Sequence, residues 1–125
     1  MNKREFLKRL NELGLPKYQY VIISGGSLLM HGLREETADI DLAISDVLAT
    51  ELGLHNKKPT KKGTYKLAKD VEVIIGMNKI PAEVIDDYLC ETLRNVYEFK
   101  KQMNRPKDQP DLELLYDYFI NESRS

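Results

Sequence analysis

Residues 25–44, GGSLLMHGLREETADIDLAI, decide the fold of this 125-residue chain. They follow an apolar run at residues 20–23, whose β-branched and aromatic composition is typical of a buried strand. The glycine pair then predicts a turn, and the apolar residues from Leu28 to Leu33 predict a short helix that closes at Gly32. Residues 39–44 predict a second strand. The expected unit is therefore strand, glycine turn, helix, strand.

Two aspartates open the second strand, and their spacing determines where they point. Residues two apart in a strand share a face, so Asp39 and Asp41 project together. The opposite, buried side takes the apolar residues Ile40, Leu42 and Ile44. Neighbouring carboxylates repel each other unless a cation lies between them, and Mg²⁺ prefers such oxygen ligands together with substrate phosphates. Because the pair alone is more typical of a solvated strand face, the metal interpretation depends on what precedes it.

Gly25, Gly26 and Ser27 supply the complementary half of a phosphate site. Consecutive glycines let the backbone approach a ligand closely, a helix N-terminus offers unpaired N–H groups, and the Ser27 hydroxyl adds a donor. A glycine turn alone is equally typical of any strand-to-helix connection. Together with the aspartate pair, it indicates a site where one element binds phosphate oxygens and the other neutralises their charge.

The remaining sequence predicts helices before and after the strands. We expect a helix over 3–13 that is ended by Gly14 and Pro16, and a short helix over 46–52 that is capped by Ser45 or Asp46. A polar and basic loop is expected over 55–63, and strands over 64–67 and 71–75. Helical structure should follow Pro81, and a last helix should begin near Asp108 with Pro110 in its first turn. Beyond Pro81 we expect two helical faces, the first with Val84, Ile85, Tyr88 and Leu89, the second with Leu93, Val96 and Tyr97.

These elements predict an α+β fold, a mixed β-sheet flanked by helices with a helical C-terminal segment. We expect a single domain over 1–125, with a core over about 18–80 and the helical segment over about 81–122. The net charge of −1 argues against binding a polyanion through bulk charge. With one cysteine, Cys90, the chain can form neither an internal disulfide nor a Cys/His metal cluster. No signal peptide or membrane span is expected, and a cytoplasmic location follows from the cysteine usage.

The same residues carry a family resemblance. Gly26-Ser27, then Gly32-Leu33-Arg34, then Asp39-Ile40-Asp41 resemble the signature of the DNA polymerase β-like nucleotidyltransferase superfamily in order, spacing and local structure. The resemblance implies a minimal nucleotidyltransferase fold. It also implies a third carboxylate on a later strand, for which Asp70 and Glu72 are both candidates. We favour Glu72, which lies inside the strand between Val71 and Val73, although the family more often has Asp there.

A second resemblance covers the C-terminal part. Lys100, Arg105-x-Lys107-Asp108 and Asp111-Leu112 are similar to the ending of small bacterial nucleotidyltransferases, including the abortive-infection type of toxin–antitoxin pairs. This resemblance implies that a basic helical segment packs near the nucleotide. Asp108 and Asp111 also suit plain helix capping, because negative side chains favour a helix N-terminus.

The resemblance implies a Mg²⁺-dependent transfer of a nucleoside monophosphate from an NTP to a hydroxyl acceptor. Two Mg²⁺ ions, with Mn²⁺ as an alternative, would be held by Asp39, Asp41 and the third carboxylate. The expected nucleotide-binding residues are Gly25, Gly26, Ser27, Arg34, Arg105 and Lys107. The acceptor is an RNA, a protein or a small molecule such as a metabolite or antibiotic, and a homodimer or partner protein could complete the site. The alternative is an inactive nucleotide-binding partner or regulator, for example in a toxin–antitoxin pair.

Two further features have competing interpretations. Lys57, Lys58, Lys61 and Lys62 form a basic loop, which is more typical of a solvated loop than of one that steers a nucleotide or RNA end. Tyr116 could stack a base, but its spacing favours core packing.

Overall fold

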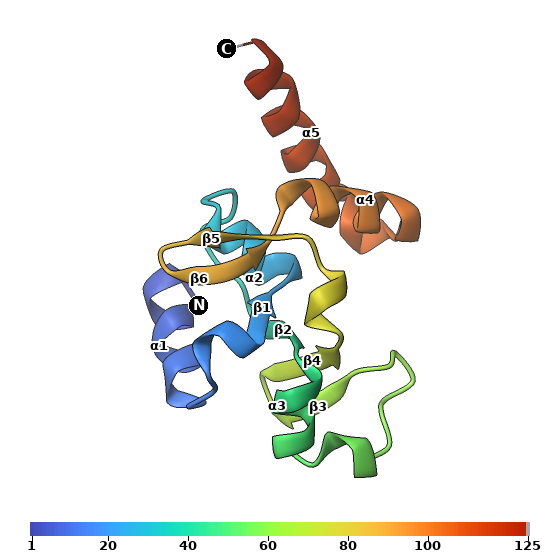
Figure 1. Cartoon of the computed structure of the whole chain (residues 1–125). Coiled ribbons are helices and arrows are strands. Elements are labelled where there is room, and N and C mark those ends of the chain that lie inside the picture. Colours follow the sequence, from blue (N-terminus) through green and yellow to red (C-terminus); the bar gives the residue numbers. More distant parts are fainter. Residues whose placement is uncertain (125) are drawn as a thin grey trace.

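The computed structural model describes residues 1–124 and contains one six-stranded sheet in the order β3-β4-β2-β1-β6-β5 (Figure 1). The strands are β1 (Tyr20–Ile22), β2 (Ile40–Ile44), β3 (Tyr65–Ala68), β4 (Val71–Ile75), β5 (Ala82–Ile85) and β6 (Tyr88–Glu91). The helices are α1 (Lys3–Glu12), α2 (Ser24–Met30), α3 (Asp46–Glu51), α4 (Leu93–Met103) and α5 (Gln109–Arg124). Short 3₁₀ turns are η1 (Lys17–Gln19), η2 (Leu54–Asn56), η3 (Met77–Lys79) and η4 (Pro106–Asp108). The predicted α+β class is confirmed.

The centre of the sheet has the predicted alternation of side chains. β2 pairs with β1 antiparallel and with β4 parallel, in a register that places Asp41 beside Glu72. Ile40, Leu42 and Ile44 are fully buried, in the same cluster as apolar residues of α1 and α3. The opposite face of β2 is therefore the one that carries Asp41.

Several helix ends also agree with the sequence signals. α1 ends at Glu12, and Gly14 follows with φ 66°, a left-handed conformation that glycine adopts without strain. α3 begins after Ser45, whose Oγ accepts a hydrogen bond from the Leu48 N–H at 3.0 Å. Of the two predicted caps, Ser45 is therefore the one that acts.

The prediction of helical structure directly beyond Pro81 is wrong. Residues 82–91 form the hairpin β5–β6, which turns at Asp86 and Asp87 with φ of 51° and 71°. Positive φ at both central residues belongs to a type I′ turn, whose twist matches that of paired strands. The apolar pairs at 84, 85, 88 and 89 are symmetric about this turn, so Val84 pairs with Leu89. That symmetry reproduces i, i+4 helical spacing, which explains the error.

The hairpin also moves the predicted boundary of the core. β6 pairs parallel with β1, joining Cys90 to Ile22, so the sheet extends to Glu91 instead of ending near residue 80. The helical segment begins at Leu93, after Thr92 accepts the Asn95 N–H at 3.2 Å as the N-cap of α4.

The predicted glycine turn is replaced by helix. α2 begins at Ser24, and it is Ser24, not a glycine, that adopts a left-handed φ of 55°. Gly26 is needed for a different reason, because a Cβ there would lie 2.8 Å from the Cζ of Phe6 and 2.9 Å from a methyl of Ile22. Its missing side chain lets α2 pack closely on α1 and the sheet.

The two last helices cover the start of α2. Leu93 and Val96 of α4 pack with Leu115 of α5 and Leu28 of α2 in a second buried cluster. The rest of α5 extends away from the sheet (Figure 1). No helix among residues 1–124 has the length and apolar character that a bilayer crossing demands.

Candidate functional site

A cavity of about 980 Å³ opens between the Asp41 face of the sheet and the region where α4, η4 and α5 meet. One side is the sheet wall, defined as Asp39, Asp41 and Glu72. The other is the helical wall, defined as Lys100, Arg105, Lys107, Asp108 and Asp111. Both sets line the same cavity, together with Ser24, Gly25, Arg34 and Lys62.

The sheet wall gathers negative charge that no ion pair among the described residues neutralises, although Lys62 and Lys100 are near enough to Asp41 to lower the pKa of its carboxyl, and Lys66 lies opposite Glu72 in the sheet register. Asp41 is half-buried, and burial raises the pKa of its carboxyl above the ordinary value, with further increases from Glu72 and Asp39. Among residues 1–124, no ion pair and no hydrogen bond engages the carboxylate of Asp39, Asp41 or Glu72. The arrangement is electrostatically unfavourable by itself, and a cation bound there would relieve it.

The donors of the sheet wall suit a hard divalent cation. Mg²⁺ takes carboxylate oxygens and keeps its remaining positions for water and phosphate, and Asp39, Asp41 and Glu72 offer only such oxygens. Within the described part of the chain, no three His, Cys, Asp or Glu side chains already stand close enough to hold a metal. The fit therefore rests on the donor chemistry and on the shared face of adjacent strands.

The structure separates the two candidates for the third carboxylate. Glu72 lies beside Asp41 in the sheet register and lines the cavity. Asp70 does not line it and forms a two-pronged pair with Arg9 of α1, with both N–O distances 2.9 Å. The Arg9 guanidinium lowers the pKa of the Asp70 carboxyl, because it binds the charged form. Asp70 thus ties α1 to the sheet, while Glu72 faces the cavity.

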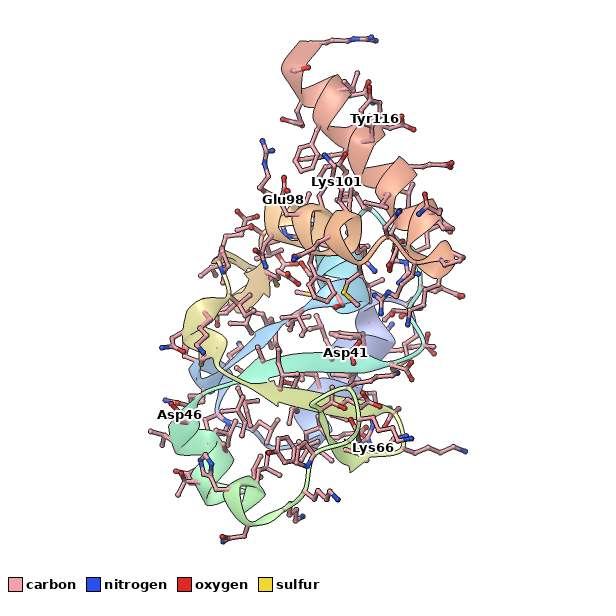
Figure 2. The ribbon with its side chains drawn as sticks, turned by 90° about the vertical axis from the view of Figure 1, so that its right-hand side faces the viewer. Asp41, Asp46, Lys66, Glu98, Lys101 and Tyr116 are labelled. Carbon is pink, nitrogen blue, oxygen red and sulfur yellow. The ribbon has the colours of Figure 1, made fainter. Side chains whose placement is uncertain are left out.

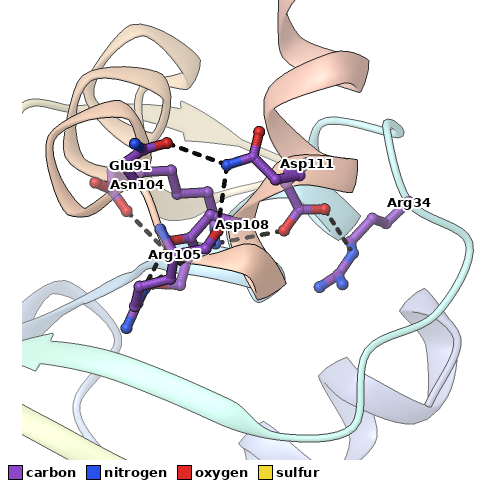
Figure 3. A network of polar contacts seen from close by, with 9 residues as sticks. Arg34, Glu91, Asn104, Arg105, Asp108 and Asp111 are labelled. Atoms are coloured by element: carbon purple, nitrogen blue, oxygen red, sulfur yellow. Dashed lines mark hydrogen bonds and ion pairs between the residues drawn. The ribbon is translucent and has the colours of Figure 1, made fainter.

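Asp108 is the most buried charge of the helical wall, with 1% of its surface exposed. Arg105 donates to it from Nε at 2.8 Å and from Nη2 at 3.1 Å, and Lys100 Nζ lies at 3.4 Å (Figure 3). These partners, Arg105 first, lower the pKa of the Asp108 carboxyl to about 2. Asp108 also accepts the backbone N–H of Arg105 at 3.1 Å, so part of its role is the capping that the sequence suggested.

Asp111 connects this network to Arg34. The Asp111 carboxylate lies 3.3 Å from Lys100 Nζ and 3.4 Å from Arg34 Nε (Figure 3). Gly25 makes room for this arginine, because a Cβ at that position would lie only 2.5 Å from Arg34 Nη1. The arginine and the C-terminal basic residues, predicted from separate motifs, thus meet at one cavity.

Two lysines at the cavity remain exposed. Lys107 is the middle residue of η4, and Lys62 belongs to the basic loop. Lys62 is close enough to Asp41 to lower the pKa of that carboxyl slightly against the dominant effect of burial. Of the four loop lysines, Lys62 is the one that lines the cavity.

Gly26 and Ser27 are not brought to the cavity. Ser27 is fully buried, and its hydroxyl donates to the backbone carbonyl of Glu91 at 2.6 Å. The neighbouring residues Ser24 and Gly25 line the cavity instead. Tyr116 is also outside it and is 56% exposed, so its predicted core packing is wrong.

Glu91 is an important residue that sequence reasoning missed. It is 6% exposed, accepts the Ser24 N–H at 2.9 Å and accepts the Asn95 side-chain N–H at 2.6 Å. Burial raises the pKa of its carboxyl, while these two hydrogen bonds oppose the rise. Glu91 thereby fixes the strained backbone of Ser24 and joins the start of α2 to α4.

No protein-family model, no curated protein and no solved structure matches this chain. The functional argument therefore rests on the chain's own motifs and on the cavity they surround.

Proposed function

We propose that the chain is a Mg²⁺-dependent nucleotidyltransferase that moves a nucleoside monophosphate from an NTP to a hydroxyl acceptor. The observation that carries this proposal is a single cavity with carboxylates that have no ion-pair partner on one side and basic side chains held by Asp108 and Asp111 on the other. A metal–triphosphate complex has matching charges, because its cation suits the sheet wall and its phosphates suit the helical wall.

In this proposal the sheet wall holds the metal. Asp39, Asp41 and Glu72 would bind two Mg²⁺ ions, which supply charge stabilisation to the attacking and leaving oxygens of an in-line displacement. Glu72, the carboxylate on the neighbouring strand, would also orient the acceptor hydroxyl and accept its proton. The acceptor oxygen then forms its bond to the α-phosphorus, and pyrophosphate leaves.

Cations on the other side would hold the phosphates. Arg34, Arg105 and Lys107 are the predicted ligands, and Lys62 and Lys100 also face the cavity. Arg34 and Arg105 are already oriented by Asp111 and Asp108, which reduces the entropy lost when they bind an anion. Fixed positive groups of this kind stabilise charge that develops on the leaving pyrophosphate.

A second candidate is a nucleotide-binding regulator without transfer activity, for example within a toxin–antitoxin pair. The observation that favours it is Glu72, since the resembled family more often has Asp at the third position. RNA, a protein side chain or a small hydroxyl compound remains the expected class of acceptor. A homodimer or partner protein that completes the acceptor site is part of the same proposal.

The test separates binding from transfer. We expect calorimetry with each NTP and Mg²⁺ to give binding that EDTA abolishes and that Asp41→Asn weakens at least about 100-fold. Asp46→Asn is the matched control, because this exposed aspartate lies on α3, away from the cavity (Figure 2). Absence of binding by the unsubstituted chain would refute both candidates. Binding without transfer of α-labelled nucleotide to RNA, protein or small hydroxyl compounds would favour the regulator.

A further inference from the structure

Two exposed apolar side chains line the same cavity. Phe99 and Met103 of α4 keep 49% and 47% of their surface exposed. They are four residues apart, so they lie next to each other on one face of the helix. They continue the apolar side of α4 that carries Val96, but they lie outside the buried cluster that Leu93 and Val96 form with α2 and α5. Packing within the chain therefore leaves about half of each side chain uncovered.

Their position distinguishes them from the other exposed apolar residues. Among residues 1–124, the remaining large side chains of this kind lie outside the cavity: Tyr18, Val47, Val84, Leu114 and Tyr116. Isolated apolar residues on a surface are ordinary, whereas apolar residues inside a charged pocket are typical of ligand contact. Phe99 and Met103 are thus the pair for which a ligand is the most direct explanation.

The chemistry around the pair identifies the part of the ligand that it would contact. Lys100 follows Phe99 directly and is held at the cavity by Asp108 and Asp111. The cavity therefore sets an apolar surface beside cations. A ligand that matches both has a flat, weakly polar ring attached to an anionic chain, and a free phosphate or pyrophosphate has only the second part.

We propose that Phe99 and Met103 form the nucleobase subsite of this cavity. The inference rests on the proposed function, because it assigns one part of the nucleotide whose phosphates the cations would hold. An aromatic ring stacks on any base through its face, and a thioether packs well against aromatic rings. Neither side chain carries a strong hydrogen-bonding group, so this subsite selects poorly among bases.

The test compares a nucleotide with its phosphate chain alone. Calorimetry with Mg²⁺ measures ATP and inorganic tripolyphosphate on the full chain, on Phe99→Ala and on Phe99→Tyr. We expect Phe99→Ala to weaken ATP binding roughly 5- to 100-fold and to leave tripolyphosphate binding unchanged. Phe99→Tyr keeps the ring and should bind ATP nearly as the unsubstituted chain does. GTP, CTP and UTP should lose affinity alongside ATP.

Tyr116→Ala is the matched control, because it removes an exposed aromatic ring of α5 outside the cavity (Figure 2). Its ATP affinity should be unchanged. If Phe99→Ala binds ATP normally, or if Tyr116→Ala loses the affinity instead, the base subsite is wrong while the proposed function stands. An equal loss of ATP and tripolyphosphate would also overturn the subsite. A chain that binds neither ligand overturns the proposed function itself.

Discussion

The sheet wall and the helical wall of the cavity both carry carboxylates, but among the described residues only those of the helical wall form ion pairs. Asp108 and Asp111 are each held by two basic side chains within 3.4 Å. Asp41 and Glu72 lie on adjacent strands with no such partner among the described residues. A paired charge can serve the fold, whereas an unpaired cluster of like charges costs stability and points to a ligand.

The difference assigns separate roles to residues of the same chemical type. Carboxylates of the helical wall hold α4, η4 and α5 in place and aim basic groups at the cavity. Those of the sheet wall are left for a cation. Substitutions should therefore affect ligand binding at the sheet wall and folding stability at the helical wall.

The largest effect is expected on the sheet wall, at Glu72. Glu72→Gln should lower nucleotidyl transfer at least about 100-fold, because in the proposed function it removes a metal ligand and the group that would orient the acceptor. Its melting temperature without metal should not fall, since the substitution relieves repulsion with Asp41. Transfer of α-labelled nucleotide and thermal melting measure the two effects.

Asp70→Asn is the matched control for that variant, two residues away on the same segment. It breaks the half-exposed pair with Arg9, so it should lower the melting temperature by a few degrees and leave transfer unchanged. The reverse pattern, with an active Glu72→Gln and an inactive Asp70→Asn, would make Asp70 the third carboxylate.

On the helical wall, Asp108→Asn should mainly change stability. The substitution takes the carboxylate from Arg105, which is partly exposed, while Lys100 keeps its pair with Asp111, so we expect a cost of about 1–2 kcal/mol in the free energy of unfolding, below that of a fully buried ion pair. Urea denaturation measures this cost. Asp117→Asn, an exposed aspartate further along α5, should stay close to the unsubstituted chain. Equal stabilities of the two variants would show that the network does not hold the helices.

Acid should act on the two walls in opposite directions. The pKa of Asp108 is lowered to about 2, so its contribution to stability is present above the ordinary value and is lost as pH falls from about 4 to 2. The pKa of the Asp41 carboxyl is raised, so the protonated carboxyl favours the folded state. This stabilisation is lost as pH rises through the raised pKa.

Urea denaturation in EDTA from pH 7 to pH 2 measures this contrast. Asp41→Asn should be more stable than the unsubstituted chain at pH 7, and its advantage should shrink on acidification. Asp108→Asn should be less stable at pH 7, and its deficit should shrink only below about pH 4. Parallel pH curves for the three proteins would remove the electrostatic distinction between the walls.

Sequence reasoning recovered the parts of the fold that depend on local pattern. The alternation over 39–44 gave the correct buried and cavity-facing sides of β2, and the stop at Gly14 gave the end of α1. It failed at 82–91, where apolar pairs symmetric about Asp86 and Asp87 fit a hairpin and a helix equally well. The positive φ values of the two turn residues select the hairpin over the helix, and a hydrophobic pattern does not specify them.

The residues of the candidate site also differ in whether a local sequence pattern predicts them. Asp39 and Asp41 follow from strand periodicity, whereas the third carboxylate, Glu72 or Asp70, and the basic residues Arg34, Arg105 and Lys107 are expected only through the family resemblance. The sequence predicts the turn at the glycine pair, whereas the residue with positive φ is Ser24, directly before it. Glu91 could not be found, because its contact with Ser24 depends on the long-range pairing of β6 with β1.

Glu91 joins the start of α2 to α4, and its substitution should have the smallest effect on binding. One oxygen accepts from Ser24 on the α2 side, and the other accepts from Asn95 on α4. Glu91→Ala removes the acceptor of two partly buried donors, at a cost of about 1 kcal/mol in the free energy of unfolding. It should also weaken Mg²⁺–NTP binding about tenfold, because Gly25, Arg34 and Lys100 lose their common alignment.

Two variants separate positioning from plain stability. Glu91→Gln should restore affinity, because its amide oxygen can accept from Ser24 while its N–H donates to a flipped Asn95 side chain. Glu98→Ala removes an exposed glutamate of the same helix and should change neither property. If Glu91→Ala unfolds more easily but binds Mg²⁺–NTP with unchanged affinity, Glu91 stabilises the fold without aligning α2 and α4 for the ligand, and each of the two helices then holds its own cavity residues in place.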